Sequence, residues 1–456
     1  MVTVNGSYVF SQHASPVNVV LIVSDDQRAD TIAALGNQLI RTPSLDRLVR
    51  RGTVFDNAFC ANPICTPSRA EILTGCSGIR NRVFDFGRTI DPQLPTLPEP
   101  FARAGYSTWY CGKWHNNGQP EDHGYSLTRG LYTGGGGKWA KPQGDYRGHP
   151  ATGYSGWIFR DQDGLPLPEL GVGLTPNISE VIADAAVDVI ARSPRPFFLH
   201  VNFTAPHDPL LIPPGDAYAY SSEQMRLPEN FAAAHPFDHG NAAGRDENVL
   251  PPPRTEQQVR SDLAAYYSVI THMDAQIGRI IDALDGRDTL GQTIIVFCSD
   301  HGLAMGSHGL RGKQNQYEHT IRVPLILAGP GIPQNRRSAG HAYLRDLFPT
   351  LCELAGIESP DVDGMSQVAV LKGEKDSVYE FTIGYFRDSQ RMIRTNQWKL
   401  IHYPLIERVQ LFDLRNDPLE QNDLSDNTAY TELRLDLLKR LDEWLDAQQR
   451  RVDGRR

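Results

Sequence analysis

Chemically reactive side chains form four short clusters along the chain. They are Asp25 with Asp26, Lys113 with His115, His207, and Asp300 with His301. Each cluster lies just after a short apolar run that is typical of a buried strand. The carboxyl ends of parallel strands meet at one edge of an α/β sheet, and ligands bind at that edge. If the four strands are parallel neighbours, their clusters will meet at a single site.

Two of these clusters carry the ligands that a divalent cation requires. Asp25-Asp26 supplies two carboxylates, and Asp300-His301 supplies a third carboxylate and an imidazole. This donor set suits a hard or borderline cation such as Ca²⁺ or Mg²⁺. Either pair alone could form a turn, and Asp25-Asp26 could also cap a helix. The presence of both pairs at strand ends favours a metal site.

The segment that begins at Cys65 is the most specific pattern in the chain. Cys65-Thr66-Pro67-Ser68-Arg69 is followed by Leu73-Thr74-Gly75. It resembles the signature of the type I sulfatases, in which Cys-x-Pro-Ser-Arg directs oxidation of the cysteine to formylglycine. Further motifs extend the resemblance over most of the chain: Asp25-Asp26-Gln27, Gly112-Lys113-Trp114-His115, Ala205-Pro206-His207, Ser299-Asp300-His301-Gly302, Gly312-Lys313, Leu411-Phe412-Asp413-Leu414 and Asn416-Asp417-Pro418. The chain therefore resembles a formylglycine-dependent sulfatase of the alkaline-phosphatase-like superfamily.

This resemblance implies hydrolysis of a sulfate monoester to an alcohol and inorganic sulfate. The hydrated aldehyde at position 65 would carry two hydroxyl groups on one carbon. One hydroxyl attacks sulfur and displaces the alcohol. The other then loses its proton, the aldehyde re-forms and sulfate leaves by C–O cleavage. This covalent route splits one difficult step into two easier ones, and a metal would polarise the sulfate oxygens.

The resemblance also implies one divalent cation in the site. The predicted ligands are Asp25, Asp26, Cys65 as formylglycine, Asp300 and His301. Ca²⁺ is the first candidate, with Mg²⁺ and Mn²⁺ as alternatives. Many relatives carry Asn where this chain has His301, and imidazole suits transition metals better than Ca²⁺.

Five further residues receive catalytic roles from the resemblance. Lys113 and Lys313 would contact the sulfate as point charges. Arg69 would hold the formylglycine and balance charge. His115 would be the base that removes the proton from the hydrate, and His207 would be the general acid to the leaving alcohol. An isolated lysine is usually solvated and an isolated histidine usually structural, but the strand-end positions favour the catalytic interpretation.

The substrate is less well specified. Residues 116–175 are expected to form long loops over the catalytic edge, and they offer aromatic rings that could stack on a sugar or an aryl group: Tyr125, Tyr132, Trp139, Tyr146, Tyr154 and Trp157. The C-terminal region, which often lines the pocket in this family, offers cations: Arg387, Arg391, Arg394 and Lys399. We expect a sulfated carbohydrate in preference to a small aryl sulfate. His308 could also touch substrate, and its role stays open.

Three alternatives compete with this interpretation. A phosphonate monoester or phosphodiester hydrolase could use the same scaffold, with a formylglycine and a similar metal site. A catalytically silent glycan-binding protein would keep Cys65 as a thiol. A cysteine hydrolase would pair Cys65 with a histidine base, but the two Asp clusters have no role in that mechanism. Conversion of Cys65 would require a formylglycine-generating enzyme as a partner.

Strands and helices alternate through the first part of the chain. The pattern predicts strands at 17–24, 107–111, 197–203, 293–298 and 323–328, and helices at 178–190 and 259–284. It indicates an α/β fold with a large, mostly parallel mixed sheet sandwiched by helices, forming a catalytic domain over residues 1–375. The pattern in residues 376–456 instead predicts a meander of short strands and a final helix. This order is typical of a smaller antiparallel α+β subdomain.

Composition excludes several other classes of protein. The 456 residues carry a formal charge of −9, which argues against broad nucleic-acid binding. No apolar run approaches the ~20 residues that span a bilayer, so we expect no membrane association. The six cysteines do not suit a disulfide framework. We expect a cytoplasmic location for the chain as written, or a periplasmic or secreted one if a leader was removed; the oligomeric state stays open.

Overall fold

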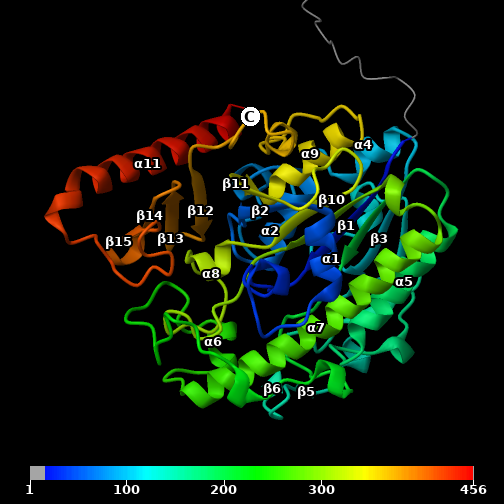
Figure 1. Ribbon diagram of the computed structural model, residues 1–456, viewed down its shortest axis with the longest axis horizontal. Helices are drawn as coiled ribbons and strands as arrows, with labels where there is room; N and C mark the ends of the chain where they lie inside the picture. The colour runs from blue at the N-terminus through cyan, green and yellow to red at the C-terminus, as the bar shows by residue number, and fades with distance from the viewer. Residues whose placement is uncertain (1–15, 152, 455–456) are drawn as a thin grey trace, which may run out of the picture.

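The computed structural model describes residues 16–151 and 153–454, which fold around a large mixed β-sheet (Figure 1). In order across the sheet, its strands are β11 (Arg336–Tyr343), β2 (Gly52–Phe59), β10 (Leu325–Ala328), β9 (Thr293–Ser299), β1 (Asn18–Ser24), β8 (Phe197–Asn202), β3 (Ser107–Lys113), β4 (Leu127–Thr133) and β7 (Ile158–Arg160). All of these strands run in the same direction except β10 and β7. The predicted mostly parallel sheet is therefore confirmed.

The strand register aligns the ends of the central strands. Ser24 at the end of β1 pairs with Ser299 at the end of β9. On its other side, β1 pairs Val23 with Asn202 of β8, and Asn202 also pairs with Gly112 of β3. The chain segments that follow these four strands consequently leave the sheet at the same edge.

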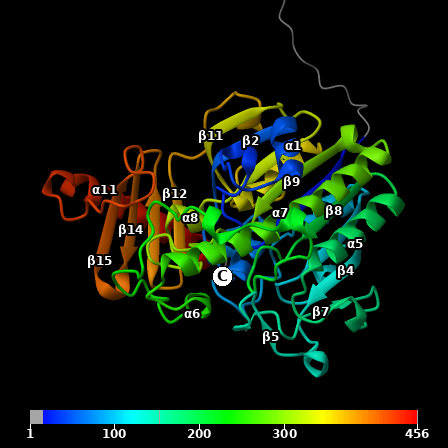
Figure 2. The ribbon, with the colours of Figure 1, turned by 60° about the horizontal axis from the view of Figure 1, so that its bottom comes forward.

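Helices cover both faces of the sheet. One face packs against α1 (Pro43–Arg51), α5 (Ile178–Arg192) and α7 (Glu256–Gly286), and α5 and α7 lie side by side (Figure 2). The other face packs against α2 (Cys65–Thr74), α4 (Pro98–Arg103), α9 (Leu347–Leu354) and α10 (Val368–Leu371). Alternate residues of β1 enter opposite cores, for example Val20 and Leu21. This burial on both faces explains why β1 is a continuous apolar run.

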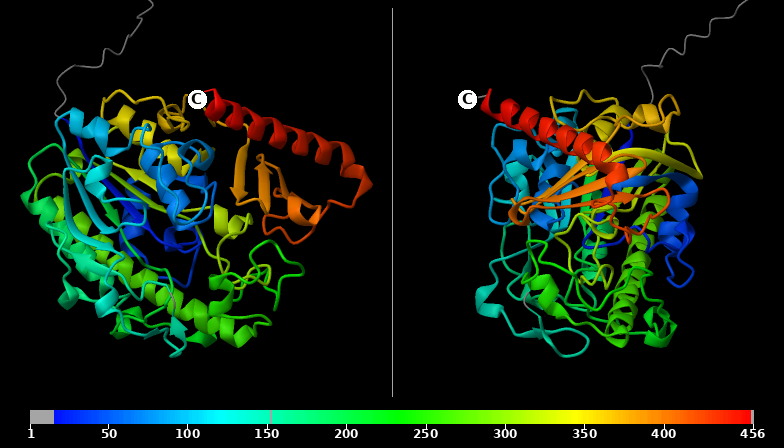
Figure 3. Two further views of the ribbon diagram at one scale, coloured as in Figure 1. Left: turned by 180° about the vertical axis from the view of Figure 1, so that it is seen from behind. Right: turned by 90° about the vertical axis from the view of Figure 1, so that its left-hand side faces the viewer.

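The C-terminal part forms the second, smaller sheet. Its antiparallel strands follow in chain order: β12 (Thr382–Phe386), β13 (Gln390–Arg394), β14 (Trp398–Tyr403) and β15 (Arg408–Asp413). The helix α11 (Thr431–Asp453) packs against β13 and β14 (Figure 3). Phe59, Tyr317 and Tyr343 of the larger part share an apolar cluster with this sheet. The boundary at residue 375 stays a prediction.

Among the described residues, none of the helices combines the length and apolar character needed to cross a bilayer.

The expectation of loops throughout residues 116–175 is wrong in part. β4 and β7 lie in this region and extend the large sheet, and a short pair, β5 (Gln143–Gly144) and β6 (Pro150–Ala151), lies between them in the chain. β4 has exposed Leu127 and a glycine at position 130, so its residues do not form the apolar run that marks a central strand. The edge strand β11 is also polar and partly exposed, which explains why the apolar pattern does not reveal it.

Gly112 shapes the end of β3 that precedes the predicted sulfate contact Lys113. The pairing of β3 with β4 shifts register between Cys111 and Gly112, as in a β-bulge. Gly112 has a φ of +87°, and a Cβ atom there would lie 2.0 Å from the carbonyl oxygen of Asn202. Only glycine satisfies both constraints.

We predict that Gly112→Ala destabilises the protein by ~3 kcal/mol or more, because both the backbone conformation and the contact with Asn202 become unfavourable. Gly105→Ala is the matched control, since Gly105 has a φ of +84° and open space around the added carbon. That control should cost only about 1 kcal/mol. Thermal denaturation of both variants measures the difference, and equal midpoints would contradict the steric argument.

Candidate active site

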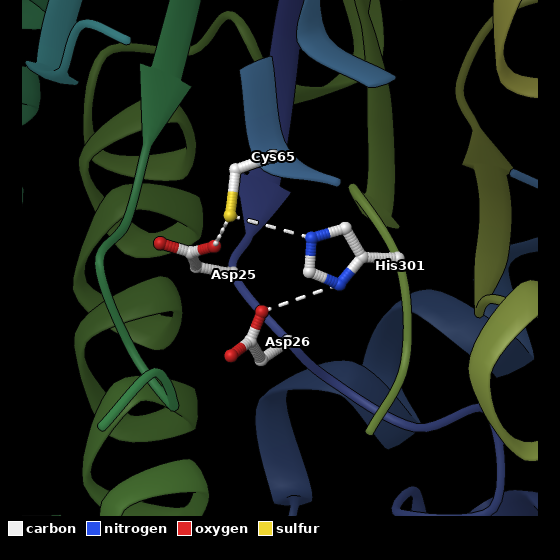
Figure 4. Close-up of side chains that lie close together, drawn as sticks. All are labelled: Asp25, Asp26, Cys65 and His301. Carbon is white, nitrogen blue, oxygen red and sulfur yellow. Dashed lines mark hydrogen bonds and ion pairs between the residues drawn. The ribbon is translucent and has the colours of Figure 1, made fainter. Parts of the chain in front are cut away.

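Four of the predicted metal ligands point toward one another at the carboxyl edge of the sheet (Figure 4). Asp25 and Asp26 directly follow β1, and His301 lies two residues beyond the end of β9. Cys65 begins α2. Each residue offers one ligand atom to a group in which all atoms lie within 4.8 Å of one another. All four residues are buried, so the sheet edge brings together a compact and shielded donor set.

The Cys65 sulfur contacts two other members of this group (Figure 4). Its Sγ atom is 3.4 Å from Oδ1 of Asp25 and 3.3 Å from Nε2 of His301. The other ring nitrogen of His301, Nδ1, lies 3.2 Å from Oδ1 of Asp26. Position 65 carries a thiol here, and the hydroxyl oxygens of a hydrated formylglycine would take the place of this sulfur.

Asp300, the fifth predicted ligand, lies beside the group but its carboxylate is already engaged. Its Oδ2 atom accepts a hydrogen bond of 3.0 Å from Nε of Arg69. Its Oδ1 atom accepts from the backbone N–H of Asp26 at 3.1 Å and lies 3.7 Å from Nε2 of His301. Asp300 is not one of the four residues that gather in the compact group, so its role as a ligand stays a prediction.

Asp26 is held in a backbone conformation that non-glycine residues rarely adopt. Its φ is +68°, in the left-handed region. Besides the bond from its N–H to Asp300, its carbonyl oxygen accepts a hydrogen bond of 2.5 Å from the hydroxyl of Tyr266 on α7. Such local strain is concentrated at functional sites, where surrounding contacts enforce it.

The two predicted sulfate-binding lysines contact residues of this ligand group, and both lysines are buried. Nζ of Lys113 donates to Oδ2 of Asp25 at 2.5 Å. Nζ of Lys313 donates to Oδ1 of Asp26 at 2.8 Å and to Sγ of Cys65 at 3.2 Å. Burial opposes charge on Lys313, but Asp26 and Cys65 outweigh it and raise the pKa of Lys313.

Arg69 lies one helical turn after Cys65 and turns toward the same site. It bonds to Asp300, places Nη2 3.7 Å from Asp25 and donates from Nη1 to Oδ1 of Asn202. Asn202 is the last residue of β8, and the sequence pattern does not predict it as part of the site. A single amide at a strand end, with no other polar residue beside it, gives little signal.

Burial and neighbouring charges shift the pKa values of two predicted metal ligands. Burial and the charge of Asp25 raise the pKa of Asp300 to about 7. Burial opposes protonation of His301, but Asp300 and Cys65 outweigh it and raise the pKa of His301 to about 9. The shift of Asp300 thus comes first from its burial, and the shift of His301 from the acidic groups beside it. The oxygen donors and the imidazole of this site fit a divalent cation in their chemistry.

His115 faces the group from the end of β3 and lines the same cavity as Cys65. Its ring meets that of Trp157 edge-on at a centroid distance of 5.0 Å. Burial and the neighbouring charge of Lys113 lower the pKa of His115 to about 4. A neutral imidazole at this position is able to accept a proton.

His207 follows β8 and lines the same cavity. Nδ1 bonds to the carbonyl oxygen of Asp208 at 2.6 Å, and Nε2 is 3.8 Å from Oδ2 of Asp26. Burial and Lys313 oppose protonation, but Asp26 and Asp208 outweigh them and raise the pKa of His207. The two histidines thus have pKa values shifted in opposite directions, a pattern that separates an acid from a base.

A cavity of about 630 Å³ opens over Cys65. It is lined by side chains from several loops, including Phe86, His115, Tyr154, Trp157, His207, Asp238, Arg245, Lys313 and Arg387. Arg245, at the start of α6 (Arg245–Val249), contacts Asp208 and His207 and was missed because no strand precedes it. The cavity is large enough for a small ligand of one or two rings.

Other candidates for substrate contact lie elsewhere. Tyr125 and Tyr132 belong to the two cores that flank the sheet. His308 stacks on Tyr317 at a centroid distance of 4.0 Å and does not line the cavity. Buried Lys399 pairs with Glu318 and Glu420, and Arg394 also pairs with Glu318.

Comparison with known proteins identifies the family. The sulfatase family model matches residues 17–357, and the C-terminal model of N-sulphoglucosamine sulphohydrolase matches residues 306–447. A choline-sulfatase of Rhizobium meliloti is 30% identical over 436 residues, which cover 90% of this chain and 82% of that protein. An arylsulfatase of Clostridium perfringens is 31% identical over 455 residues, which cover 93% of each protein.

Solved structures share the fold. One, described in complex with its substrate D-glucosamine-2-N,6-O-disulfate, has a TM-score of 0.77 at 24% identity and covers 96% of this chain and 99% of its own. The phosphonate monoester hydrolase of Agrobacterium radiobacter has a TM-score of 0.76 at 22% identity, with 95% and 96% covered. The family match extends over the strands, the helix and the loops that build the Cys65 site. The chain therefore belongs to the sulfatase family of sulfuric ester hydrolases, within the alkaline-phosphatase-like superfamily.

Proposed function

We propose that this protein hydrolyses a sulfate monoester to an alcohol and inorganic sulfate, using formylglycine at position 65 and one divalent cation. The observation that carries this proposal is the position of Cys65. Its sulfur lies within hydrogen-bonding distance of Lys313 and His301 and beside Asp25, and Cys65 lines the cavity. A nucleophile placed there would meet a substrate that enters from the cavity.

The residues that would hold the cation are Asp25, Asp26, His301 and position 65, with Asp300 as a further candidate. Their oxygen and imidazole donors suit a hard or borderline ion, and Ca²⁺ is our first choice. When bound, the cation would polarise the sulfate oxygens and favour ionisation of a hydroxyl group.

The chain's own residues would carry the remaining chemistry. The ammonium groups of Lys113 and Lys313 would bind sulfate oxygens. His207 would donate its proton to the oxygen of the leaving alcohol. His115 would take the proton of the remaining hydroxyl on residue 65, so that the C=O bond re-forms as the C–O bond to sulfate breaks. Arg69 would hold residue 65 against Asp25 and Asp300.

A sulfated carbohydrate is the substrate that we favour. An N-acetylglucosamine-6-O-sulfatase of Bacteroides thetaiotaomicron is 26% identical over 93% of this chain. The cavity offers the rings of Phe86 and Trp157, and aromatic rings suit stacking on a sugar. The choline-sulfatase and arylsulfatase relatives make choline sulfate and aryl sulfates the competing substrates, and the phosphonate monoester hydrolase of the same fold keeps phosphoesters as the alternative reaction.

We predict that Cys65→Ala lowers kcat by roughly 10⁴-fold or more, because no aldehyde can form and the nucleophile is lost. Cys352→Ala, which changes a buried cysteine of α9, serves as the control and should keep most of the activity. Sulfate release and circular dichroism measure activity and folding. Substantial turnover by a folded Cys65→Ala variant would refute the assignment of the nucleophile.

We predict that His207→Ala slows alkyl sulfates by about 10²–10⁴-fold and slows nitrophenyl sulfate much less, because only a poor leaving group needs the proton. His149→Ala, a change at an exposed loop position, should affect neither substrate. Measurement of kcat for a series of leaving groups tests this role. An equal loss on both classes of substrate would count against a general acid at His207.

A substrate panel tests the preference for carbohydrates. It would contain sulfated mono- and disaccharides, choline sulfate, nitrophenyl sulfate and a phosphonate monoester. We predict that kcat/KM for at least one sulfated sugar exceeds that for nitrophenyl sulfate about tenfold, an increment of about 1.4 kcal/mol. Highest kcat/KM on choline sulfate or nitrophenyl sulfate would reject the carbohydrate, and highest kcat/KM on the phosphonate would reject the sulfatase reaction.

A further inference from the structure

Tyr154 reaches the Asp25 site from the loop that precedes β7. Its side chain is 3% exposed, and its hydroxyl donates a hydrogen bond of 2.7 Å to Oδ2 of Asp25. The ring lies edge-on to His207 at a centroid distance of 4.8 Å, and Nζ of Lys113 lies 5.1 Å from the ring centroid. Tyr154 therefore contacts a predicted metal ligand, the predicted acid and a predicted sulfate contact at once.

The two oxygens of Asp25 have different surroundings. Oδ2 accepts hydrogen bonds from Tyr154 and from Lys113, at 2.7 Å and 2.5 Å. A carboxylate oxygen has two lone-pair sites, so these two donors occupy Oδ2. Oδ1 instead faces position 65, with Sγ of Cys65 at 3.4 Å and Nη2 of Arg69 at 3.7 Å. Only Oδ1 is left to bind a cation beside residue 65.

We propose that Tyr154 is a positioning residue that fixes Asp25 as a ligand through one oxygen. The inference deepens the proposed function and rests on it. The hydroxyl of Tyr154 has a single hydrogen, which is committed to Asp25. Lys113, by contrast, has three N–H groups and is also the expected partner of the sulfate. Tyr154 is thus the donor that can hold Oδ2 throughout the reaction.

The aromatic ring has a separate task, so the hydroxyl can be tested alone. The ring of Tyr154 packs edge-on against Trp157 at 4.8 Å and lies 6.1 Å from the ring of Tyr132. A phenylalanine would keep these contacts and the wall of the cavity. Tyr132 supplies a matched control, because it lies in the same aromatic cluster, is fully buried, and its hydroxyl has no hydrogen-bond partner among the described residues.

The experiment compares Tyr154→Phe with Tyr132→Phe and with the parent protein, which carries no substitution. All three are matured to the same formylglycine content. Each protein is stripped with a chelator and titrated with Ca²⁺, and separately with Mg²⁺, in a calorimeter, which reports binding without turnover. Partners that orient a metal ligand contribute about 10–100-fold to metal affinity. We expect Tyr154→Phe to raise the Kd of the cation about tenfold or more and Tyr132→Phe to change it less than twofold. Saturating cation should restore most of the kcat of Tyr154→Phe.

Each other outcome has a defined meaning. A cation Kd for Tyr154→Phe within twofold of the Kd for the parent protein would overturn the positioning role. Loss of folded protein in Tyr154→Phe alone would also overturn it, since the hydroxyl would then serve the fold. If the parent protein, with formylglycine at position 65 and no substitution, bound neither cation and released no sulfate, the proposed function itself would fail. That conclusion would hold whatever the result for Tyr154.

Discussion

The structure depends on the neutralisation of buried acidic groups around position 65. Asp25, Asp26 and Asp300 are fully buried within one small volume, where unpaired carboxylates would be strongly destabilising. Lys113, Lys313 and Arg69 pair with them one by one. Burial raises the pKa of Asp300 to about 7, and Asp300 and Cys65 raise the pKa of His301 to about 9 against the effect of its own burial. Buried carboxylates and an imidazole gathered in this way are suited to hold a divalent cation.

The fold creates this concentration of charge through strand register. β1, β8, β3 and β9 all end at one edge, so residues separated by almost 300 positions lie within a few ångströms of one another. The helix α2, which packs on the same face of the sheet as α4 and α9, brings Cys65 to this edge. Loops after these strands, together with a turn of the smaller sheet at Arg387, enclose the cavity above it. The rigid sheet supplies precision at the site, while the surrounding loops offer the surface on which substrate choice depends.

The sequence predicts the parts of this arrangement that follow from a strong local pattern. Apolar runs predict the central strands, and polar residues directly after them predict which side chains meet, because parallel strands share one edge. The Cys65 segment predicts the family. The sequence does not reveal β4 or β11, which lie toward the sheet edges and have mixed exposure. Nor does it reveal Asn202, Arg245 or the role of Tyr154, since each acts through a contact with a residue that is distant in the chain.

In our proposal, activity comes from an aldehyde made from Cys65 beside a bound cation. The most direct measurement is peptide mass spectrometry of residue 65 across preparations in which maturation has proceeded to different extents. Specific activity should rise in proportion to the fraction of aldehyde and extrapolate to zero for the pure thiol. Activity that stays constant while that fraction varies would show that the aldehyde is not the nucleophile.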